Sequence, residues 1–278
     1  MTDRYAVIGN PISHSKSPMI HTEFARQTGQ DIVYTAILAT TENFVSTVLD
    51  FLHAGGKGMN VTVPFKEQAW KYLATDITNR AIDAEAVNTL DFRDNKIIGD
   101  NTDGAGLLRD IQNNLGFPIT GKRVLLMGAG GAAHGVMTPL LYEKPEILVI
   151  ANRTLEKANQ MVAKVQQHAS FSLHSITSSP YSNLAENKFD IVINATSSSL
   201  SGELPPLPEK LFASNALAYD LMYGGGLTPF LRFAQAQGAA RLADGLGMLV
   251  EQAAESFYFW RGVRPDTRPV IAKLKGKE

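Results

Sequence analysis

Residues 128–133 read Gly-Ala-Gly-Gly-Ala-Ala and directly follow the apolar run Arg123–Met127. A buried strand that ends in G-x-G-x-x-A and leads into a helix is typical of sites that bind the pyrophosphate of a dinucleotide. Gly128 permits the tight turn, Gly130 lets the backbone approach the phosphates, and Ala133 is small enough for the helix to pack against the strand. The helix N-terminus adds free N–H groups and a partial positive charge. These residues predict a dinucleotide-binding site.

The next apolar run, residues 146–151, indicates which dinucleotide is bound. It leads into Asn152-Arg153-Thr154, about 20 residues after the glycines, where an NAD site usually carries an acid for the ribose 2′-hydroxyl. Here the first residue is a neutral Asn152, followed by Arg153 and, one turn further on, by Lys157. A guanidinium can hold a 2′-phosphate with two parallel hydrogen bonds, whereas a carboxylate would repel it. We therefore expect NADP(H) as the cofactor, with ordinary surface charges as the alternative interpretation of Arg153 and Lys157.

The composition excludes several classes of function. The chain has 278 residues, enough for two domains with separate cores, and its formal net charge of −1 favours neither nucleic acid nor a membrane surface as a partner. It contains no cysteine, so it has neither a disulfide framework nor a thiol nucleophile. Its six histidines lack the spacing of metal ligands, and no apolar run approaches the roughly 18 residues of a membrane span. We expect a cytoplasmic protein without a metal, a monomer or homodimer that binds a small molecule.

Short apolar runs alternate with helical patterns along the chain, which predicts an α/β fold with mostly parallel sheets covered by helices. Ahead of the glycine loop we expect strands at residues 5–9, 32–38 and 58–62, helices at 18–28 and 41–53, and a hairpin joining 88–92 to 97–99. Further strands are expected at 123–127, 146–151, 189–193 and 216–221. Because a separate α/β segment precedes the glycine loop, the dinucleotide-binding domain is expected to be the second one, beginning near residue 103.

Four polar motifs lie at the ends of predicted elements in the first domain, where ligands of open α/β sheets bind. Their candidate residues are Ser15 and Ser17 before a helix, Asn60 and Thr62 on one face of a strand, Lys66 near a helix start, Asn88 opening a strand, and Asp103 at another helix start. One of the two serines is expected to be an N-cap, and Asp103 could also be an N-cap without a catalytic role. A helix N-terminus disfavours a cation, so Lys66 is a candidate functional residue.

Eight motifs occur in a characteristic order: G-N-P-I-x-H-S-K-S-P, G-x-N-V-T-V-P-F-K, A-V-N-T, G-D-N-T-D-G, G-A-G-G-A, N-R-T, N-A-T-S and A-D-G-L-G-M-L-V-x-Q-A. Over essentially the whole chain they resemble the shikimate dehydrogenase family, whose members reduce 3-dehydroshikimate to shikimate with NADPH in aromatic amino-acid biosynthesis. The resemblance implies a mostly parallel α/β substrate-binding domain at residues 1–103, completed by C-terminal helices at 245–278. It also implies a Rossmann-type NADP-binding domain at residues 104–244, with a cleft between the domains.

The resemblance also implies roles for individual residues. Lys66 and Asp103 are implied as the catalytic pair, in which Lys66 exchanges the proton and Asp103 holds the ammonium group. The residues implied to bind shikimate are Ser15, Ser17, Asn60, Thr62, Lys66, Asn88, Asp103, Tyr223 and Gln252. Those implied to bind the cofactor are Gly128, Ala129, Gly130, Gly131, Ala132, Asn152, Arg153, Thr154, Lys157, Thr196, Met222 and Gly245. One departure is His134, which stands where relatives often carry an arginine.

Three alternatives to this interpretation are open. The nearest is a quinate/shikimate dehydrogenase with relaxed cofactor and substrate specificity, a subtype that tends to carry an acid after the second cofactor strand and altered hydroxyls at the serine pair. Neither change occurs here. A non-enzymatic relative that only senses the ligand could lose Lys66 or Asp103, and both are present. Another NADP enzyme, such as a folate-intermediate dehydrogenase, would not explain the motifs of the first domain.

Overall fold

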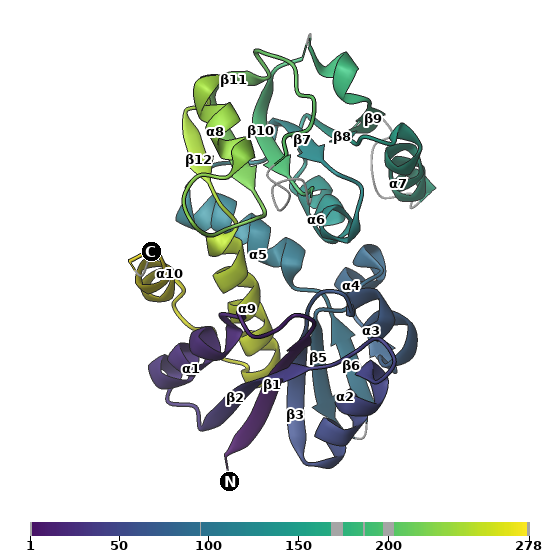
Figure 1. Cartoon of the computed structure of the whole chain (residues 1–278), viewed down its shortest axis with the longest axis vertical. Coiled ribbons are helices and arrows are strands. Elements are labelled where there is room, and N and C mark those ends of the chain that lie inside the picture. The colour runs from purple at the N-terminus through teal and green to yellow at the C-terminus, as the bar shows by residue number, and fades with distance from the viewer. Residues whose placement is uncertain (1, 95, 168–174, 186, 197–202, 277–278) are drawn as a thin grey trace. The chain divides into compact units, whose positions relative to one another are not determined.

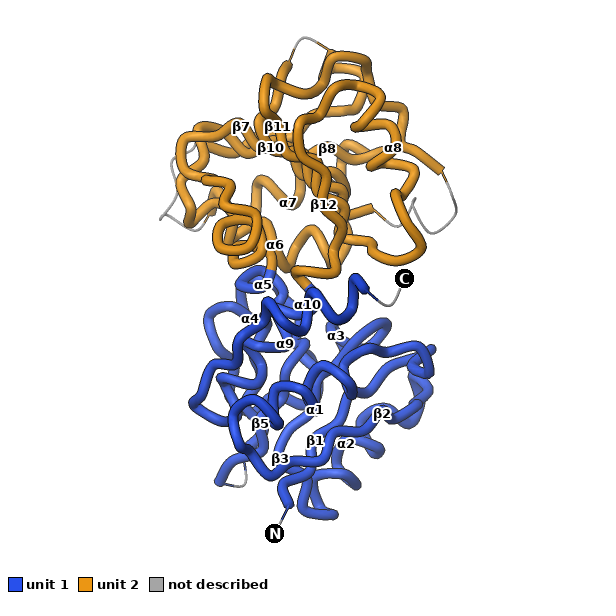
Figure 2. The backbone as a smooth tube through the Cα atoms, turned by 90° about the vertical axis from the view of Figure 1, so that its left-hand side faces the viewer, with its two compact units in different colours: residues 1–106, 249–277 blue, residues 107–248, 278 orange. Residues whose placement is uncertain are grey.

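The structure is a computed structural model that describes residues 2–94, 96–167, 175–185, 187–196 and 203–276. The chain divides into two compact units, which Figure 2 shows in different colours: unit 1 comprises residues 1–106 and 249–277, and unit 2 comprises residues 107–248. The backbone passes from one unit to the other within two helices, α5 (Asp103–Arg109) and α9 (Leu246–Arg261). Among the helices of the described residues, none combines the length and the apolar character that crossing a membrane requires.

Unit 1 is built on a six-stranded sheet in the order β2-β1-β3-β5-β6-β4. Its strands are β1 (Asp3–Gly9), β2 (Ile32–Leu38), β3 (Gly56–Val61), β4 (Asp76–Ile77), β5 (Thr89–Arg93) and β6 (Lys96–Asp100). The pairs β1–β2, β1–β3 and β4–β6 are parallel, and β5 runs antiparallel to both of its neighbours. The hairpin predicted from the sequence is confirmed as β5–β6, in which Thr89 lies opposite Asp100.

Helices cover both faces of this sheet (Figure 1). Unit 1 contains α1 (Ser17–Thr28), α2 (Phe44–His53), α3 (Lys66–Tyr72), α4 (Asn79–Ala84), most of α9, and α10 (Arg268–Lys275). The core beneath α2 and α3 is closed by the stacked rings of Phe44 and Phe65, 4.6 Å apart between centroids. Another aromatic contact joins α1 to α9, because the rings of Phe24 and Phe257 meet edge-on at 5.8 Å.

Unit 2 contains a second six-stranded sheet, in the order β12-β11-β10-β7-β8-β9, and every pair in it is parallel. Its strands are β7 (Arg123–Met127), β8 (Ile147–Ala151), β9 (Ile176–Ser179), β10 (Phe189–Asn194), β11 (Phe212–Asp220) and β12 (Arg241–Ala243). Its helices are α6 (Gly131–Tyr142), α7 (Leu155–Gln167) and α8 (Pro229–Ala236), with the short turns η1 (Asp110–Asn114) and η2 (Tyr181–Leu184). In chain order this is the 3-2-1-4-5-6 arrangement of Rossmann folds.

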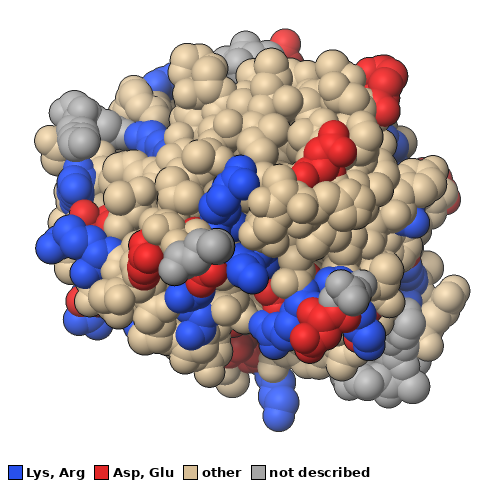
Figure 3. Space-filling model, turned by 90° about the horizontal axis from the view of Figure 1, so that it is seen from below, with Lys and Arg blue, Asp and Glu red and all other residues tan. Residues whose placement is uncertain are grey.

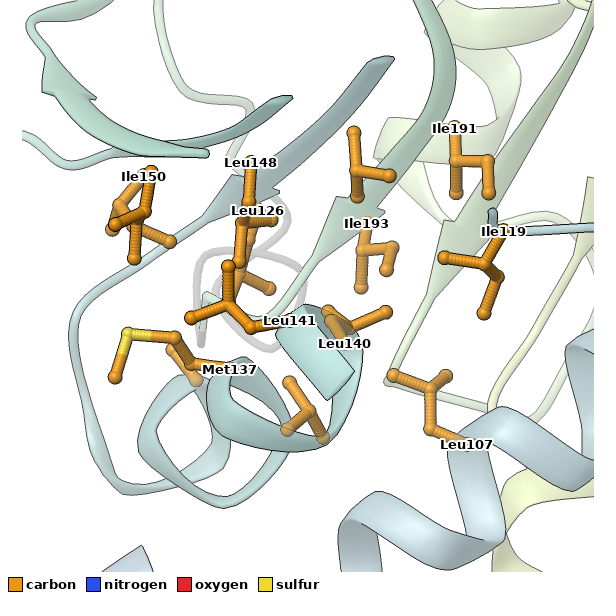
Figure 4. Close-up of a cluster of buried hydrophobic side chains, with 14 of the residues drawn as sticks. Leu107, Ile119, Leu126, Met137, Leu140, Leu141, Leu148, Ile150, Ile191 and Ile193 are labelled. Atoms are coloured by element: carbon orange, nitrogen blue, oxygen red, sulfur yellow. The ribbon is translucent and has the colours of Figure 1, made fainter. Parts of the chain in front are cut away.

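The core of unit 2 fixes the helix that follows the glycine loop against the sheet (Figure 4). Side chains from β7, β8, β10 and α6 interdigitate there; they include Leu126, Met137, Leu140, Leu141, Leu148, Ile150, Ile191 and Ile193. Burying a side chain of this kind contributes about 1.5–3 kcal/mol. The position of α6, and with it that of the loop, is therefore set by packing.

Three local predictions are wrong. β3 ends at Val61, so Thr62 lies beyond the strand, because the Thr62 carbonyl accepts from the Phe65 N–H (2.9 Å) and turns the chain. Neither serine is the N-cap of α1: Lys16 occupies that position, and the Ser15 hydroxyl accepts from the Ser17 N–H (3.3 Å). The helix expected from residue 41 begins at Phe44, after Asn43, whose side chain accepts from the Thr40 N–H (2.7 Å).

The charged side chains are mixed in sign on the face that Figure 3 shows. There Lys and Arg lie among Asp and Glu, with uncharged surface between them. This distribution agrees with a formal net charge of −1 over the whole chain.

Candidate functional site

The glycine loop of unit 2 lines a cavity of about 690 Å³. The strand register explains its location, because Met127 at the end of β7 pairs with Ala151 of β8 and with Asn194 of β10. The loops that follow these three parallel strands therefore leave the sheet at the same edge. The residues lining the cavity are Gly128, Ala129, Gly130, Gly131, Ala132, Asn152, Arg153, Tyr181, Ala195, Thr196, Glu203, Leu204, Pro205 and Pro206.

The backbone of the glycine loop fits a pyrophosphate. Gly128 has φ +108°, and a Cβ there would lie 3.1 Å from the Ala195 carbonyl oxygen, so a side chain would be strained. A Cβ at Gly130 or Gly131 would meet no protein atom within 4 Å, which leaves open space in front of this backbone. Gly130 is the N-cap of α6 and offers no capping side chain to the first turn. The helix N-terminus can therefore bind the anionic group of a dinucleotide.

The residues after β8 lie beside this loop. Asn152 turns the chain by donating from Nδ2 to the Thr154 carbonyl (2.9 Å), and Arg153 and Lys157 are exposed cations near the start of α7. Arg153 lines the cavity, whereas Thr154 and Lys157 lie in the turn next to it. This charge distribution suits a phosphate at the 2′ position of an adenosine ribose.

Two buried polar residues at strand ends hold the remaining candidate cofactor residues. Asn194 accepts from the Thr196 hydroxyl (2.6 Å), and Asp220 accepts from the Met222 N–H (3.1 Å). The Asn194 amide also donates to Asp220 (3.2 Å), which joins the ends of β10 and β11. Gly245 donates its N–H to the Met222 carbonyl (3.1 Å). The sequence motif N-A-T-S contained Asn194, but its positioning role depends on Asp220, which no local pattern connects to it.

In unit 1, Lys66 and Asp103 form an ion pair. The distance from Lys66 Nζ to Asp103 Oδ2 is 2.6 Å, and 30% and 14% of the two side chains are exposed. α3 begins at Lys66 and α5 begins at Asp103, so both groups project from helix starts. An N-cap role for Asp103 is wrong, because Asn101 accepts from the Asp103 N–H (3.1 Å) while the Asp103 carboxylate binds Lys66. The carboxylate offsets the unfavourable position of a cation at the start of α3.

Asn88 connects this pair to α9. Its side chain is 2% exposed, and its Nδ2 donates to Asp103 Oδ1 (2.9 Å), to the Thr102 hydroxyl (2.9 Å) and to Gln252 Oε1 (3.4 Å). The Thr102 N–H donates back to Asn88 Oδ1 (2.9 Å). The structure thus brings Lys66, Asn88, Asp103 and Gln252 together, and it adds Thr102, which was not singled out although it lies within the G-D-N-T-D-G motif.

Asn60 holds Asn88 in position through a hydrogen bond to its backbone. Its amide donates to the Asn88 carbonyl (3.2 Å) and to the Ser256 hydroxyl (3.0 Å), and its Oδ1 accepts from the Tyr34 hydroxyl (2.7 Å). The ring of Tyr34 stacks on fully buried His21 at 4.2 Å between centroids. Burial lowers the pKa of His21 to about 3, although the Asn60 side chain opposes this shift, and burial raises the pKa of Tyr34 well above its ordinary value.

The other predicted substrate residues follow the strands β1, β3 and β11. Ser15, Ser17 and Thr62 follow the neighbouring strands β1 and β3, and no hydrogen bond within the described residues joins them to the Lys66–Asp103 pair. Thr62 is close to the end of β1, since a Cβ on Gly9 would lie 2.5 Å from its methyl group. Tyr223 belongs to unit 2, where it follows β11, and burial raises its pKa.

Comparison with known proteins relates both units to one family. The model of the shikimate dehydrogenase substrate binding domain matches residues 7–90. The model described as shikimate / quinate 5-dehydrogenase matches residues 110–201, and that of the shikimate 5′-dehydrogenase C-terminal domain matches residues 245–275.

Similar proteins cover almost the whole chain. Shikimate dehydrogenase (NADP⁺) of Nitrosospira multiformis is 60% identical over 99% of this chain and 98% of its own length, and that of Nitrosomonas europaea is 58% identical over 98% and 97%. The crystal structure of an Ael1 enzyme from Pseudomonas putida superposes with a TM-score of 0.93 at 53% identity, covering 98% of both chains. Shikimate 5-dehydrogenase from Thermus thermophilus, solved with NADP(H) and shikimate, gives 0.85 at 30% identity, again over 98% of both chains.

Proposed function

This chain belongs to the shikimate dehydrogenase family, and we propose that it catalyses the reversible NADPH-dependent reduction of 3-dehydroshikimate to shikimate. It is then an NADP-dependent oxidoreductase that acts on a CH–OH group in aromatic amino-acid biosynthesis. The observation that carries the proposal is the ion pair between Lys66 and Asp103, because it presents an ammonium group that a carboxylate holds in place. An ammonium group in this position can exchange a proton with an alcohol or ketone oxygen.

The chain's own residues supply the proton chemistry and the binding. When bound, NADPH supplies the hydride for reduction of the ketone. Negative charge develops on the ketone oxygen, and the Lys66 ammonium stabilises this charge and donates the proton. In the reverse direction the neutral Lys66 amine accepts the proton of the alcohol. Asp103, itself held by Asn88 Nδ2 at 2.9 Å, fixes the position of Lys66 Nζ throughout.

We propose that a set of polar residues that includes this pair recognises a small anionic ring with several hydroxyls. The proposed set is Ser15, Ser17, Asn60, Thr62, Lys66, Asn88, Asp103, Tyr223 and Gln252. Each can donate or accept hydrogen bonds, and a site that pairs each hydroxyl rejects analogues that lack one. Asn60 already bonds Tyr34, Asn88 and Ser256, which favours a role in holding Asn88.

We propose a division of binding between two domains, with substrate at residues 1–103 and 245–278 and NADP(H) at residues 104–244. Gly128–Ala132 would hold the pyrophosphate, and Asn152, Arg153, Thr154 and Lys157 the adenosine 2′-phosphate. Thr196, Met222 and Gly245 complete the proposed cofactor set. The open backbone of the glycine loop and the cations after β8 support this assignment. A cytoplasmic location and a monomeric or homodimeric state stay predictions.

The test is the reaction itself. Purified protein is mixed with shikimate and NADP⁺, NADPH is followed by its absorbance, and 3-dehydroshikimate is quantified by chromatography. The proposal expects both products in equal amounts. Absence of turnover in a protein that is folded by circular dichroism would reject it.

A further inference from the structure

One aromatic residue of unit 2 has no role in the assignments above. Tyr181 begins η2, directly after β9, and it lines the cavity of the glycine loop. Because Ser179 at the end of β9 pairs with Ala151 at the end of β8, the segments leading to Tyr181 and Arg153 leave adjacent parallel strands at the same edge of the sheet. Tyr181 and Arg153 therefore approach the cavity from neighbouring strands.

Tyr181 is fixed in position and remains neutral. Its side chain is 5% exposed and packs in the cluster that contains Val149, Ala151 and Leu184. Burial raises the pKa of its hydroxyl to about 12, and the charge of Arg153 acts in the opposite direction. Within the described residues the structure gives this hydroxyl no hydrogen bond. A rigid ring with an uncharged hydroxyl is thus available at the cavity wall.

The segment of residues 203–206 also lines the cavity, and it is apolar except for Glu203. Leu204, Pro205 and Pro206 line the same cavity, and 37% of Leu204 is exposed although its side chain is large and apolar. An aromatic ring beside aliphatic side chains suits a flat heteroaromatic base. Arg153, the cation that could bind a phosphate, follows β8 and lines the same cavity.

We propose that Tyr181, together with Leu204, binds the adenine base of the cofactor. Tyr181 then raises the affinity for the nucleotide whether or not a 2′-phosphate is present, whereas Arg153 discriminates between the two forms. This inference rests on the proposed function, because it concerns the cofactor that the function requires.

The test is equilibrium binding by isothermal titration calorimetry on the full chain, with 2′,5′-ADP and 5′-AMP as probes. Stacking of a base on an aromatic side chain contributes enough that Tyr181→Ala is expected to weaken both probes by roughly tenfold, with their ratio unchanged. Tyr181→Phe keeps the ring and is expected to retain most of the affinity. Leu204→Ala changes an exposed position where folding is not at risk. It is expected to lower the affinity for both probes by the same factor, which is smaller than that of Tyr181→Ala. Arg153→Ala is expected to lower only the affinity for 2′,5′-ADP.

Two results would overturn the assignment. A loss confined to 2′,5′-ADP in Tyr181→Ala would make Tyr181 a phosphate contact, and unchanged binding in both Tyr181→Ala and Leu204→Ala would place the base elsewhere. The unaltered protein separates this failure from failure of the proposed function. If it binds 2′,5′-ADP more tightly than 5′-AMP and the variants bind each probe as tightly as it does, the cofactor proposal stands and the role of Tyr181 falls.

Discussion

The two candidate sites of this chain differ in whether backbone groups or side chains form them. The cavity of unit 2 is centred on backbone, because the glycine loop at its strand ends offers N–H groups and open space. The network of unit 1 is formed by side chains, among which Asn60 and Ser256 are bonded although 196 residues separate them in the sequence. A backbone site is specified by a local motif, whereas a side-chain network is specified by the whole fold around it.

The largest difference between the sites should appear on removing Lys66. We expect Lys66→Ala to lower kcat by about 10²–10⁴, the usual range for loss of a general acid, while binding of 2′,5′-ADP is unchanged. Steady-state kinetics and calorimetry measure the two effects. Lys71→Ala on the same helix, where the exposed lysine approaches Glu67 at 4.0 Å, is the matched control. A fall of less than about tenfold would remove Lys66 from the proton transfer.

The cation after β8 should affect cofactor choice and leave the chemistry unchanged. Arg153→Ala is expected to raise the KM for NADP⁺ by about ten- to a hundredfold, the range for hydrogen bonds to a charged group, and to change the KM for NAD⁺ little. Lys188→Ala, an exposed lysine that does not line the cavity, serves as the control. Equal effects on the two cofactors would contradict the assignment of a 2′-phosphate site.

The buried support of the side-chain network should make stability depend on pH. His21 has a folded-state pKa of about 3, below the ordinary 6.5, so it takes up a proton more readily when the chain is unfolded. Its contribution to stability is therefore complete above about pH 6.5 and is lost as the pH falls towards 3, at a cost of about 2 kcal/mol between pH 7 and pH 5.

Urea unfolding of the unaltered protein and of His21→Phe at several pH values measures this contribution. The phenyl ring keeps the stack on Tyr34 and cannot be protonated, so the difference in unfolding free energy between the two proteins should shift by that amount. Parallel pH profiles would show that His21 does not titrate in this range.

A side chain in the glycine loop should affect binding and leave the fold intact. The Cβ added in Gly130→Val would have no protein atom within 4 Å. The backbone at this position, with φ −103° and ψ −176°, is extended, and valine readily adopts that conformation. Because Gly130 is the N-cap of α6 and valine is a poorer N-cap than glycine, we expect a small loss of stability, of about 1 kcal/mol or less. The affinity for 2′,5′-ADP should fall by about tenfold, equivalent to about 1.4 kcal/mol.

Gly128→Val is the matched comparison. Its φ of +108° and the Ala195 carbonyl 3.1 Å from a Cβ predict lost stability, by about 1–3 kcal/mol from the backbone conformation alone. A larger loss of stability in Gly130→Val than in Gly128→Val, or a Gly128→Val protein as stable as the unaltered one, would contradict the description of this loop.

The same contrast explains how far the sequence could be interpreted. The strands β7 and β8, the glycine loop and Arg153 follow from local patterns of apolar residues, glycine and charge. The contact of Asn88 with Gln252 joins residues 164 positions apart, and only the resemblance to a family placed both in one site. Tyr34, Thr102 and Ser256 were missed because a buried hydroxyl has no sequence signature, and the strand end at Thr62 was missed because it depends on the Phe65 N–H.

The most direct test of the account crosses shikimate and quinate with NADP⁺ and NAD⁺ and measures kcat/KM for the four combinations in the unaltered protein. Efficient turnover is expected only for shikimate with NADP⁺. Comparable values for quinate or for NAD⁺ would contradict it, and would mean that the serine pair and Arg153 do not set the specificity assigned to them.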